Sequence, residues 1–256
     1  AWTHDSVPGF TTHIWAPDVI RFKNKWYLAY SCSTFGKNTS AIGLLSNTSL
    51  SDKDGWKDEG CLVASKGDRD NWNAIDPNFI VDEKGNPWLT WGSFWDGIQM
   101  IKLDKKTMHV KKGAKPQTIA RRHAVGDVSA EPNPTSKFAG TNAIEAPFIM
   151  KHGGYYYLFV SWDYCCRGIK SNYRVAVGRS KKVAGPYLDK AGRDMRNGGG
   201  TLILEGDKKE YEAMGHCSAY SFSDGDYFFC HGYSVPKNGA SILVQKKINW
   251  TEDGWL

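Results

Sequence analysis

Four segments of the chain resemble one another, and each carries a side chain that could take part in acid–base chemistry. They are residues 13–20 (HIWAPDVI), 73–80 (NAIDPNFI), 142–149 (NAIEAPFI) and 215–222 (GHCSAYSF). We expect Asp18, Asp76 and Glu145 to share one register in three of them, with His216 close to the equivalent place in the fourth. Like charges in a narrow pocket repel, so at least one carboxyl should keep its proton at neutral pH. A protonated carboxyl is what glycoside hydrolysis needs as its general acid.

A structural interpretation of these residues competes with the catalytic one. A single Asp beside Pro more often caps a turn or satisfies buried backbone groups than reacts with a substrate. Three aligned carboxylates with Trp and Asn neighbours favour a functional site. Aromatic side chains near the ends of the predicted strands could stack on the C–H faces of sugar rings, although single Trp residues are more often core. They are Trp15, Phe35, Trp95 and Trp162.

The elements that would position these residues are short strands. A hairpin-type turn and an aromatic strand follow each segment; the predicted strands cover residues 25–31, 87–93, 155–161 and 227–233. A third strand follows in each case, at residues 41–46, 97–103, 174–180 and 241–245, and a weaker fourth segment such as 56–63 ends some modules. Because little of this shows a 3.6-residue period, the unit is a four-stranded antiparallel sheet, repeated four times. Such repetition predicts an all-β chain folded as a β-propeller.

The repeat also sets the expected domain organisation. We expect one propeller domain over residues 1–256, with modules at roughly 13–70, 71–140, 141–212 and 213–256. In a propeller the first strand of each blade lines the central axis. The four similar segments are therefore predicted to converge at one end of the channel.

Composition and charge exclude several classes of protein. The chain has 256 residues, of which 41% are apolar and 13% aromatic, and this excludes membrane spans, collagen, coiled coils and wholesale disorder. The net charge is +6, which indicates either an ordinary basic surface or attraction to a polyanion such as nucleic acid or an acidic polysaccharide. The basic clusters are short and match no known nucleic-acid module, so we expect neither a nucleic acid nor a membrane as partner.

The six cysteines do not decide the cellular compartment. No C-x-x-C pair occurs, which argues against a zinc ribbon, and whether adjacent Cys165 and Cys166 are linked stays open. No basic segment followed by an apolar run opens the chain, so we expect any signal peptide to have been removed. We expect a secreted, periplasmic or cell-surface protein.

Several strings together give the chain a family resemblance. They are residues 13–18 (HIWAPD), 35–43 (FGKNTSAIG), 73–77 (NAIDP), 92–95 (GSFW), 144–149 (IEAPFI) and 215–216 (GH). Jointly they resemble the glycoside hydrolase family 43 arabinanases over essentially the whole chain. The resemblance implies a five-bladed propeller and an inverting hydrolase of α-1,5-linked L-arabinofuranose chains in arabinan. An arabinofuranosidase or β-xylosidase on the same scaffold is the alternative within the family.

The resemblance also implies roles for individual residues. Glu145 would be the general acid, and Asp76 would raise the pKa of that acid and orient it. His216 would contact a calcium or sodium ion on the propeller axis, with a structural or electrostatic role. The residues implied to line the substrate subsites are Trp15, Phe35, Gly36, Asn73, Ala74, Ile75, Ser93, Phe94, Trp95 and Cys165. For Cys165, a tight packing loop is an equally good interpretation.

One catalytic group is missing from this pattern. The family's general base is an Asp in a His-Asp-Pro string of the first blade, and His4-Asp5-Ser6 lacks the proline and lies too close to Trp15. Asp18 matches a separate motif. We therefore expect a first-blade segment that supplies the base to be absent from this chain. A sugar-binding propeller without turnover, or a protein-interaction propeller, is the alternative to an enzyme; endo or exo action, the identity of the ion and the oligomeric state stay open.

Overall fold

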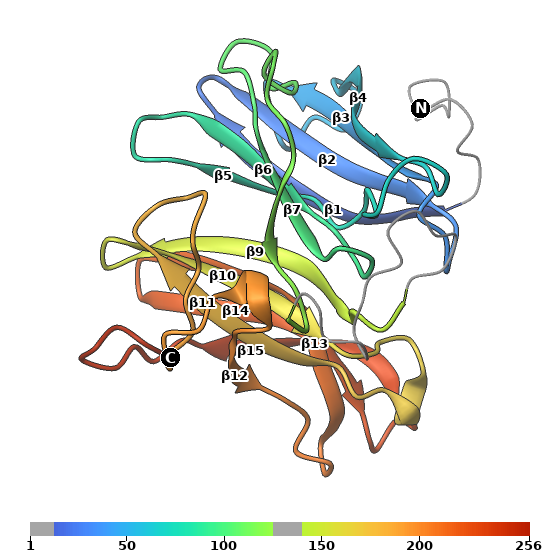
Figure 1. Ribbon diagram of the computed structural model, residues 1–256, viewed down its shortest axis with the longest axis vertical. Coiled ribbons are helices and arrows are strands. Elements are labelled where there is room, and N and C mark those ends of the chain that lie inside the picture. Colours follow the sequence, from blue (N-terminus) through green and yellow to red (C-terminus); the bar gives the residue numbers. More distant parts are fainter. Residues whose placement is uncertain (1–12, 125–139) are drawn as a thin grey trace. The chain divides into compact units, whose positions relative to one another are not determined.

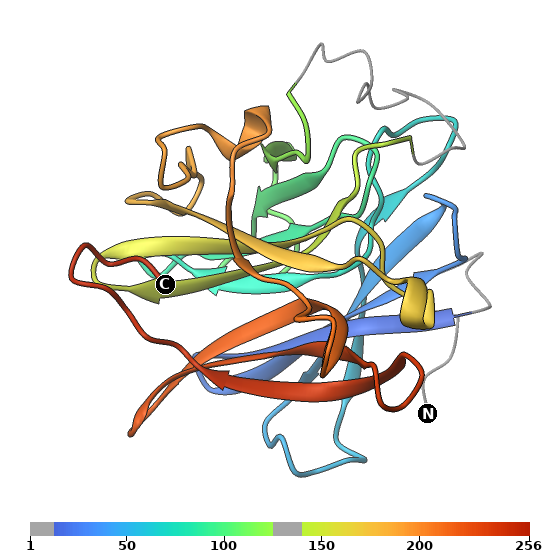
Figure 2. The ribbon, with the colours of Figure 1, turned by 90° about the horizontal axis from the view of Figure 1, so that it is seen from below.

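The structure is a computed structural model of the 256-residue chain, and it describes residues 13–124 and 140–256. Its strands form four antiparallel sheets, and the strands of each sheet run side by side in chain order (Figures 1 and 2). A meander of this kind is the sheet of a propeller blade. The prediction of an all-β chain is confirmed.

The four sheets follow one another along the chain. The first consists of β1 (His13–Phe22), β2 (Lys25–Ser33), β3 (Ser40–Asn47) and β4 (Lys57–Ser65). The second consists of β5 (Asn78–Val81), β6 (Pro87–Trp91), β7 (Ile98–Lys102) and β8 (Gln117–Ala120). The third consists of β9 (Ile144–His152), β10 (Tyr155–Trp162), β11 (Arg174–Ser180) and β12 (Thr201–Leu204).

The fourth sheet differs from the expected four-stranded unit. In the described part of the chain it has three strands, β13 (Tyr211–Phe222), β14 (Gly225–Ser234) and β15 (Ala240–Lys247). Two short 3-10 helices, η2 (Gly168–Lys170) and η3 (Met195–Asn197), lie in the connections of the third module.

The predicted hairpins form where the turn residues indicated. Gly153 and Gly154 join β9 to β10 with φ angles of 54° and 79°. Two consecutive residues with positive φ make the turn whose twist matches that of paired strands, and glycine adopts this conformation without strain.

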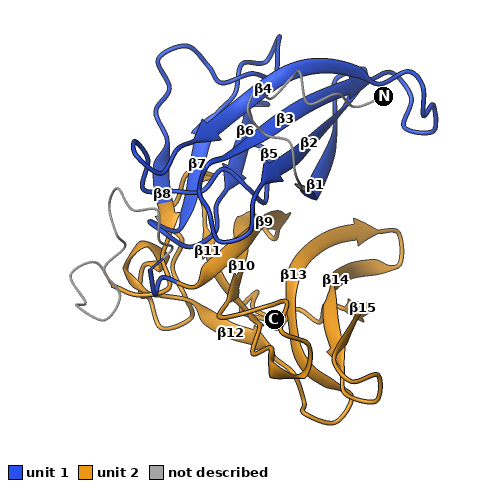
Figure 3. Cartoon of the chain, turned by 90° about the vertical axis from the view of Figure 1, so that its right-hand side faces the viewer, with its two compact units in different colours: residues 1–118, 131–142 blue, residues 119–130, 143–256 orange. Residues whose placement is uncertain are grey.

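The chain divides into two compact units, which are described separately (Figure 3). Within the described residues, one unit comprises 13–118 and 140–142, and the other comprises 119–124 and 143–256. Each unit has its own apolar core, built from inward-facing residues of its sheets. Leu44, Leu89 and Trp91 lie at the centre of the first core, and Phe159, Val175 and Val177 at the centre of the second. In both, these side chains are fully buried.

Candidate active site

Three of the four similar segments form a bulge in the first strand of a sheet. In β1 the pairing register shifts between Trp15 and Asp18, and in β13 it shifts between Gly215 and Ser218. In β9 the same shift lies opposite residues 159–161 of β10. In the second module the segment precedes β5, which begins at Asn78.

The prediction that Asp18, Asp76 and Glu145 share one register is wrong. Glu145 pairs with Ser161 immediately before the bulge of β9, whereas Asp18 pairs with Ala29 immediately after the bulge of β1. Side chains alternate between the faces of a strand, and an inserted residue changes which face each one takes. An alignment by carboxylate alone does not include this alternation.

The structure instead places Asp76, Ala146 and His216 at equivalent positions. Their φ angles are 56°, 51° and 51°, in the left-handed region that residues with a side chain rarely adopt. The backbone N–H of Asp76 donates to Ser31 Oγ at 3.0 Å, and the N–H of His216 donates to Ser161 Oγ at 2.8 Å. Each serine lies on the second strand of the preceding sheet. These two serines were missed by the sequence analysis, although both end the aromatic strand that follows a repeated segment.

The loop that carries Asp76 rests on serine hydroxyl groups. Ser40 Oγ donates to Asn73 Oδ1 at 2.6 Å, and the Ala74 N–H donates to Ser65 Oγ at 2.9 Å. Asn73, Ala74 and Asp76 are all buried, with Asp76 only 6% exposed. Because its backbone is bonded on both sides, the loop fixes the backbone position from which the Asp76 side chain extends.

The remaining predicted substrate residues of the first unit differ in exposure. Phe35 is 74% exposed and is followed by Gly36 at φ 74°, so its ring stands on a turn in contact with solvent. Trp95 is 2% exposed, and its carbonyl oxygen accepts a hydrogen bond from Asn142 Nδ2 at 2.7 Å. Phe94 and Trp95 both have positive φ. Trp15 is half-buried, while Ile75 and Ser93 are buried.

In the second unit, Glu145 is held by a tyrosine that the sequence analysis missed. Tyr173 Oη donates to Glu145 Oε1 at 2.6 Å. The Tyr173 side chain is 1% exposed, and its carbonyl oxygen accepts from the Met214 N–H at 3.0 Å. A Cβ atom on Gly215 would overlap the Tyr173 ring. Gly215 is therefore required for space, and this explains a glycine beside His216.

The adjacent cysteines lie at the buried cluster that contains the same tyrosine. Cys165 and Cys166 form a disulfide, and the Cys166 N–H donates to Tyr233 Oη at 2.9 Å. Cys165 packs against a buried cluster that includes Tyr173 and Tyr233. Burial raises the pKa of Tyr233, and the Glu145 charge raises it further. Cys165 thus packs against the cluster that contains the tyrosine bound to Glu145.

The residues around His216 do not form an obvious ion site. The His216 and His231 rings stack at 5.6 Å, and burial lowers the pKa of His216 to about 4, with a further contribution from His231. His216 is therefore neutral at pH 7. No group of three or more His, Cys, Asp or Glu side chains that could hold a metal occurs within residues 13–124 and 140–256. Calcium takes six to eight oxygen ligands, so an ion at His216 would need water molecules to supply most of them. The ion stays a prediction, and we derive no step through it.

Asp18 has a structural role. Its Oδ2 accepts from the Phe79 N–H at 2.7 Å and from Asn78 Nδ2 at 3.2 Å, which ties β1 to β5. Burial raises the pKa of Asp18 to about 7, against the lowering effect of these hydrogen bonds. Asp5, the other carboxylate considered for the base, lies outside the described residues.

This pKa predicts a pH-dependent stability. The pKa of Asp18 in the folded chain lies above the usual 3.8, so the protonated side chain stabilises the fold. This contribution to the free energy of unfolding is fully present below about pH 4 and is lost as pH rises through about 7. The raised pKa corresponds to about 4 kcal/mol. The free energy of unfolding should therefore fall between pH 5 and pH 8. Replacing Asp18 by Asn should remove the part of this fall that comes from Asp18. Urea unfolding at both pH values measures it, with exposed Asp54→Asn as control. An unchanged pH slope in Asp18→Asn would contradict the assignment.

Comparison with known proteins identifies the family. The sequence profile of glycosyl hydrolases family 43 matches residues 2–256. The chain belongs to glycosyl hydrolases family 43. It is therefore a glycoside hydrolase, as predicted.

Two curated relatives cover almost all of this family 43 chain. An extracellular exo-α-(1→5)-L-arabinofuranosidase of Cellvibrio japonicus is 42% identical over 257 residues, which is 99% of this chain and 72% of the relative. An extracellular endo-α-(1→5)-L-arabinanase of Bacillus subtilis is 42% identical over 255 residues, which is 100% of this chain and 72% of the relative.

Solved structures show the same likeness. The Cellvibrio cellulosa α-L-arabinanase complexed with arabinohexaose is similar with a TM-score of 0.89 and 41% identity, over 99% of this chain and 79% of that chain. An exo-1,5-α-L-arabinanase from a bovine ruminal metagenomic library has a TM-score of 0.87 and 53% identity, over 99% and 80%. The β-propeller fold class is confirmed. Within the described residues of this family member, no helix is long and apolar enough to span a membrane.

Proposed function

We propose that this family 43 hydrolase cleaves α-1,5-linked L-arabinofuranosyl bonds in arabinan, with inversion at the anomeric carbon. The two curated relatives support this choice of substrate. They come from two different bacteria, and both are named for α-(1→5)-L-arabinose linkages. Their names also call both extracellular, and we propose that this protein works outside the cytoplasm, where a polysaccharide is accessible.

The observation that carries the proposal is the hydrogen bond from Tyr173 to Glu145. Glu145 Oε1 accepts a hydrogen bond from the phenol, so a protonated Glu145 carries its own proton on Oε2. That proton is delivered to the leaving arabinosyl oxygen as the bond to the anomeric carbon breaks. In this proposal one oxygen of the acid binds the tyrosine, and the other carries the proton for the leaving group.

The acid needs a further group to keep it protonated. A phenol that donates to a carboxylate stabilises the charged form, which works against an acid that must keep its proton. We propose that the negative charge of Asp76 opposes this effect and raises the pKa of the acid. A deprotonated Glu145 could not protonate the leaving group, so activity depends on the balance between the two.

Inversion also requires a base that activates a water on the opposite side of the sugar, with the two carboxyl groups about 6.5–9.5 Å apart. Asp18 does not suit this role, because its carboxylate is bound to the Phe79 N–H and the Asn78 amide. We assign the base to none of the carboxylates in residues 13–124 and 140–256.

Exposed Phe35 is the proposed stacking surface for a sugar ring.

The test is to incubate the protein with linear arabinan and to record both reducing-sugar release and the anomer formed first. We expect sugar release, with the β-anomer appearing in the proton NMR spectrum before mutarotation. Release of the α-anomer first would contradict inversion. Binding of arabinohexaose by calorimetry without released sugar would favour a non-catalytic sugar-binding protein, and cleavage of xylosides alone would favour a β-xylosidase.

A further inference from the structure

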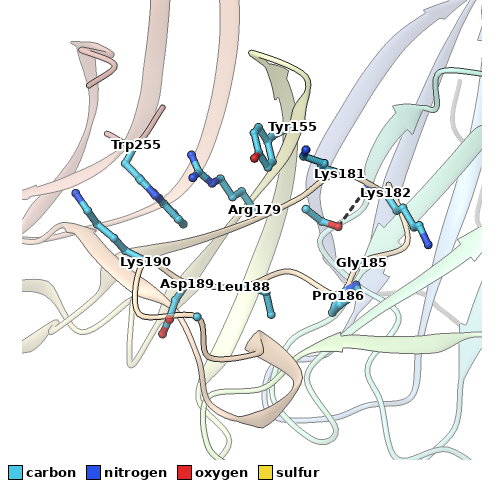
Figure 4. A pocket seen from close by; sticks show the side chains of 12 residues that line it. Tyr155, Arg179, Lys181, Lys182, Gly185, Pro186, Leu188, Asp189, Lys190 and Trp255 are labelled. Atoms are coloured by element: carbon cyan, nitrogen blue, oxygen red, sulfur yellow. Dashed lines mark hydrogen bonds between the residues drawn. The ribbon is translucent and has the colours of Figure 1, made fainter. Parts of the chain in front are cut away.

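A hollow in the second unit lies at the end of the third sheet remote from Glu145. It has a volume of about 460 Å³ and is bordered by Tyr155 of β10, Arg179 of β11 and Trp255 (Figure 4). Glu145 pairs with Ser161 near the other end of β10, six residues from Tyr155. At about 3.3 Å per residue, the two places are about 20 Å apart along the strand. The hollow is therefore separate from the proposed acid.

One residue that lines the hollow is an arginine whose guanidinium group is held on several sides. Arg179 lies over the rings of Tyr155 at 4.5 Å and Trp255 at 4.3 Å. Its Nη1 donates to the carbonyl oxygens of Asp253 at 2.7 Å and Gly254 at 2.9 Å. An arginine held on several sides loses little freedom when it binds an anion, and its planar fork matches a carboxylate.

Three lysines add positive charge to the rim. Lys181 and Lys182 are exposed, and within the described residues neither has a carboxylate within 4 Å. Lys190 has a long contact of 3.8 Å with Asp253. Asp189 is the carboxylate among the lining residues, and it accepts from Arg193 Nε and from the Gly200 N–H, both at 3.0 Å. Since these bonds already occupy Asp189, the hollow presents a surplus of positive charge.

The remaining wall is apolar and selects among anions. Pro186 and Leu188 are exposed, with Leu188 at 39%, and provide a surface for the C–H face of a sugar ring. A single-stranded nucleic acid would need exposed aromatic faces on which its bases stack. Trp255 is only 5% exposed, and cations already cover Tyr155, so no such platform is available. The volume is within the usual range of about 300–1,000 Å³ for small-ligand sites.

We propose that this hollow binds a carboxylate-bearing sugar, a uronate unit of an acidic polysaccharide. The carboxylate binds Arg179 and the lysines of the rim, and the sugar ring lies against Pro186 and Leu188. Such a site would hold the enzyme on an acidic polysaccharide while the catalytic residues act on a separate arabinan molecule. The net charge of +6 favours the encounter.

The test is calorimetric titration of the whole chain with trigalacturonate and with its methyl ester at low salt. We expect binding of the acid and not of the ester. The double variant Lys181→Gln with Lys182→Gln should bind about tenfold more weakly, from the loss of two partly screened charges. Lys111→Gln with Lys112→Gln removes the same charge from an exposed pair in the other unit, and should change binding less than twofold.

Three results would overturn the proposal. They are absence of trigalacturonate binding by the unaltered protein, an equal loss in both double variants, and equally tight binding of a trinucleotide with the same dependence on Lys181 and Lys182. Arabinan hydrolysis by the Lys181→Gln, Lys182→Gln protein should equal that of the unaltered chain. Because binding is measured without turnover, failure of the proposed arabinan activity would leave this result intact.

Discussion

Replacing Glu145 by Gln should lower the rate of arabinan hydrolysis by about 10²–10⁴-fold, the usual contribution of a general acid. Gln keeps the size of the side chain, and its amide oxygen can still accept a hydrogen bond from the Tyr173 hydroxyl group. The fold should therefore be retained, and the loss isolates the missing proton. Initial rates of reducing-sugar release from linear arabinan measure the effect, with circular dichroism to check folding.

The dependence on leaving group distinguishes a missing acid from a damaged site. A dinitrophenyl α-L-arabinofuranoside carries a leaving group that departs without a proton, so Glu145→Gln should lose much less activity on it than on arabinan. Exposed Glu205→Gln makes the same chemical change elsewhere in the second unit and should leave both activities unchanged. Near-normal arabinan hydrolysis by Glu145→Gln would remove Glu145 from the role of general acid.

The strands and hairpins were predictable because they depend on local sequence. Aromatic and β-branched runs between Gly-, Asn- and Asp-containing turns favour strand pairing whatever the rest of the chain does. The third strand of the third module, for example, was expected at residues 174–180 and lies at Arg174–Ser180. The recurrence of the pattern then gave the four sheets.

The site was less predictable because its geometry depends on bulges and on contacts between distant residues. The inserted residues of β1, β9 and β13 decide which way each carboxylate faces, and composition does not reveal them. Tyr173 is 28 residues from Glu145 in sequence, and its only signal is the glycine at 215 that makes room for its ring. The bond between Cys165 and Cys166 could not be inferred from spacing, because adjacent cysteines can be free or linked.

Replacing Asp76 by Asn should lower arabinan hydrolysis by about 10²-fold or more and shift its pH profile. Asn tolerates the left-handed φ of 56° about as well as Asp does, and the backbone bond to Ser31 Oγ is kept. The substitution therefore removes the charge with little effect on the backbone. Under the proposed mechanism the Asp76 charge raises the pKa of Glu145, so without it the acid loses its proton at a lower pH. The alkaline limb of the kcat/KM profile should move to lower pH accordingly.

Two further variants separate charge from structure. Asp76→Ala removes the charge and also places alanine at a positive φ, so it should lose about 1 kcal/mol of stability that Asp76→Asn does not. Exposed Asp68→Asn changes the net charge equally and should leave the profile unmoved. If Asp76→Asn lost activity with its alkaline limb unchanged, Asp76 would contribute to substrate binding or positioning and not to the pKa of the acid. The pH profile is therefore the decisive measurement, because a structural defect would lower the rate at every pH alike.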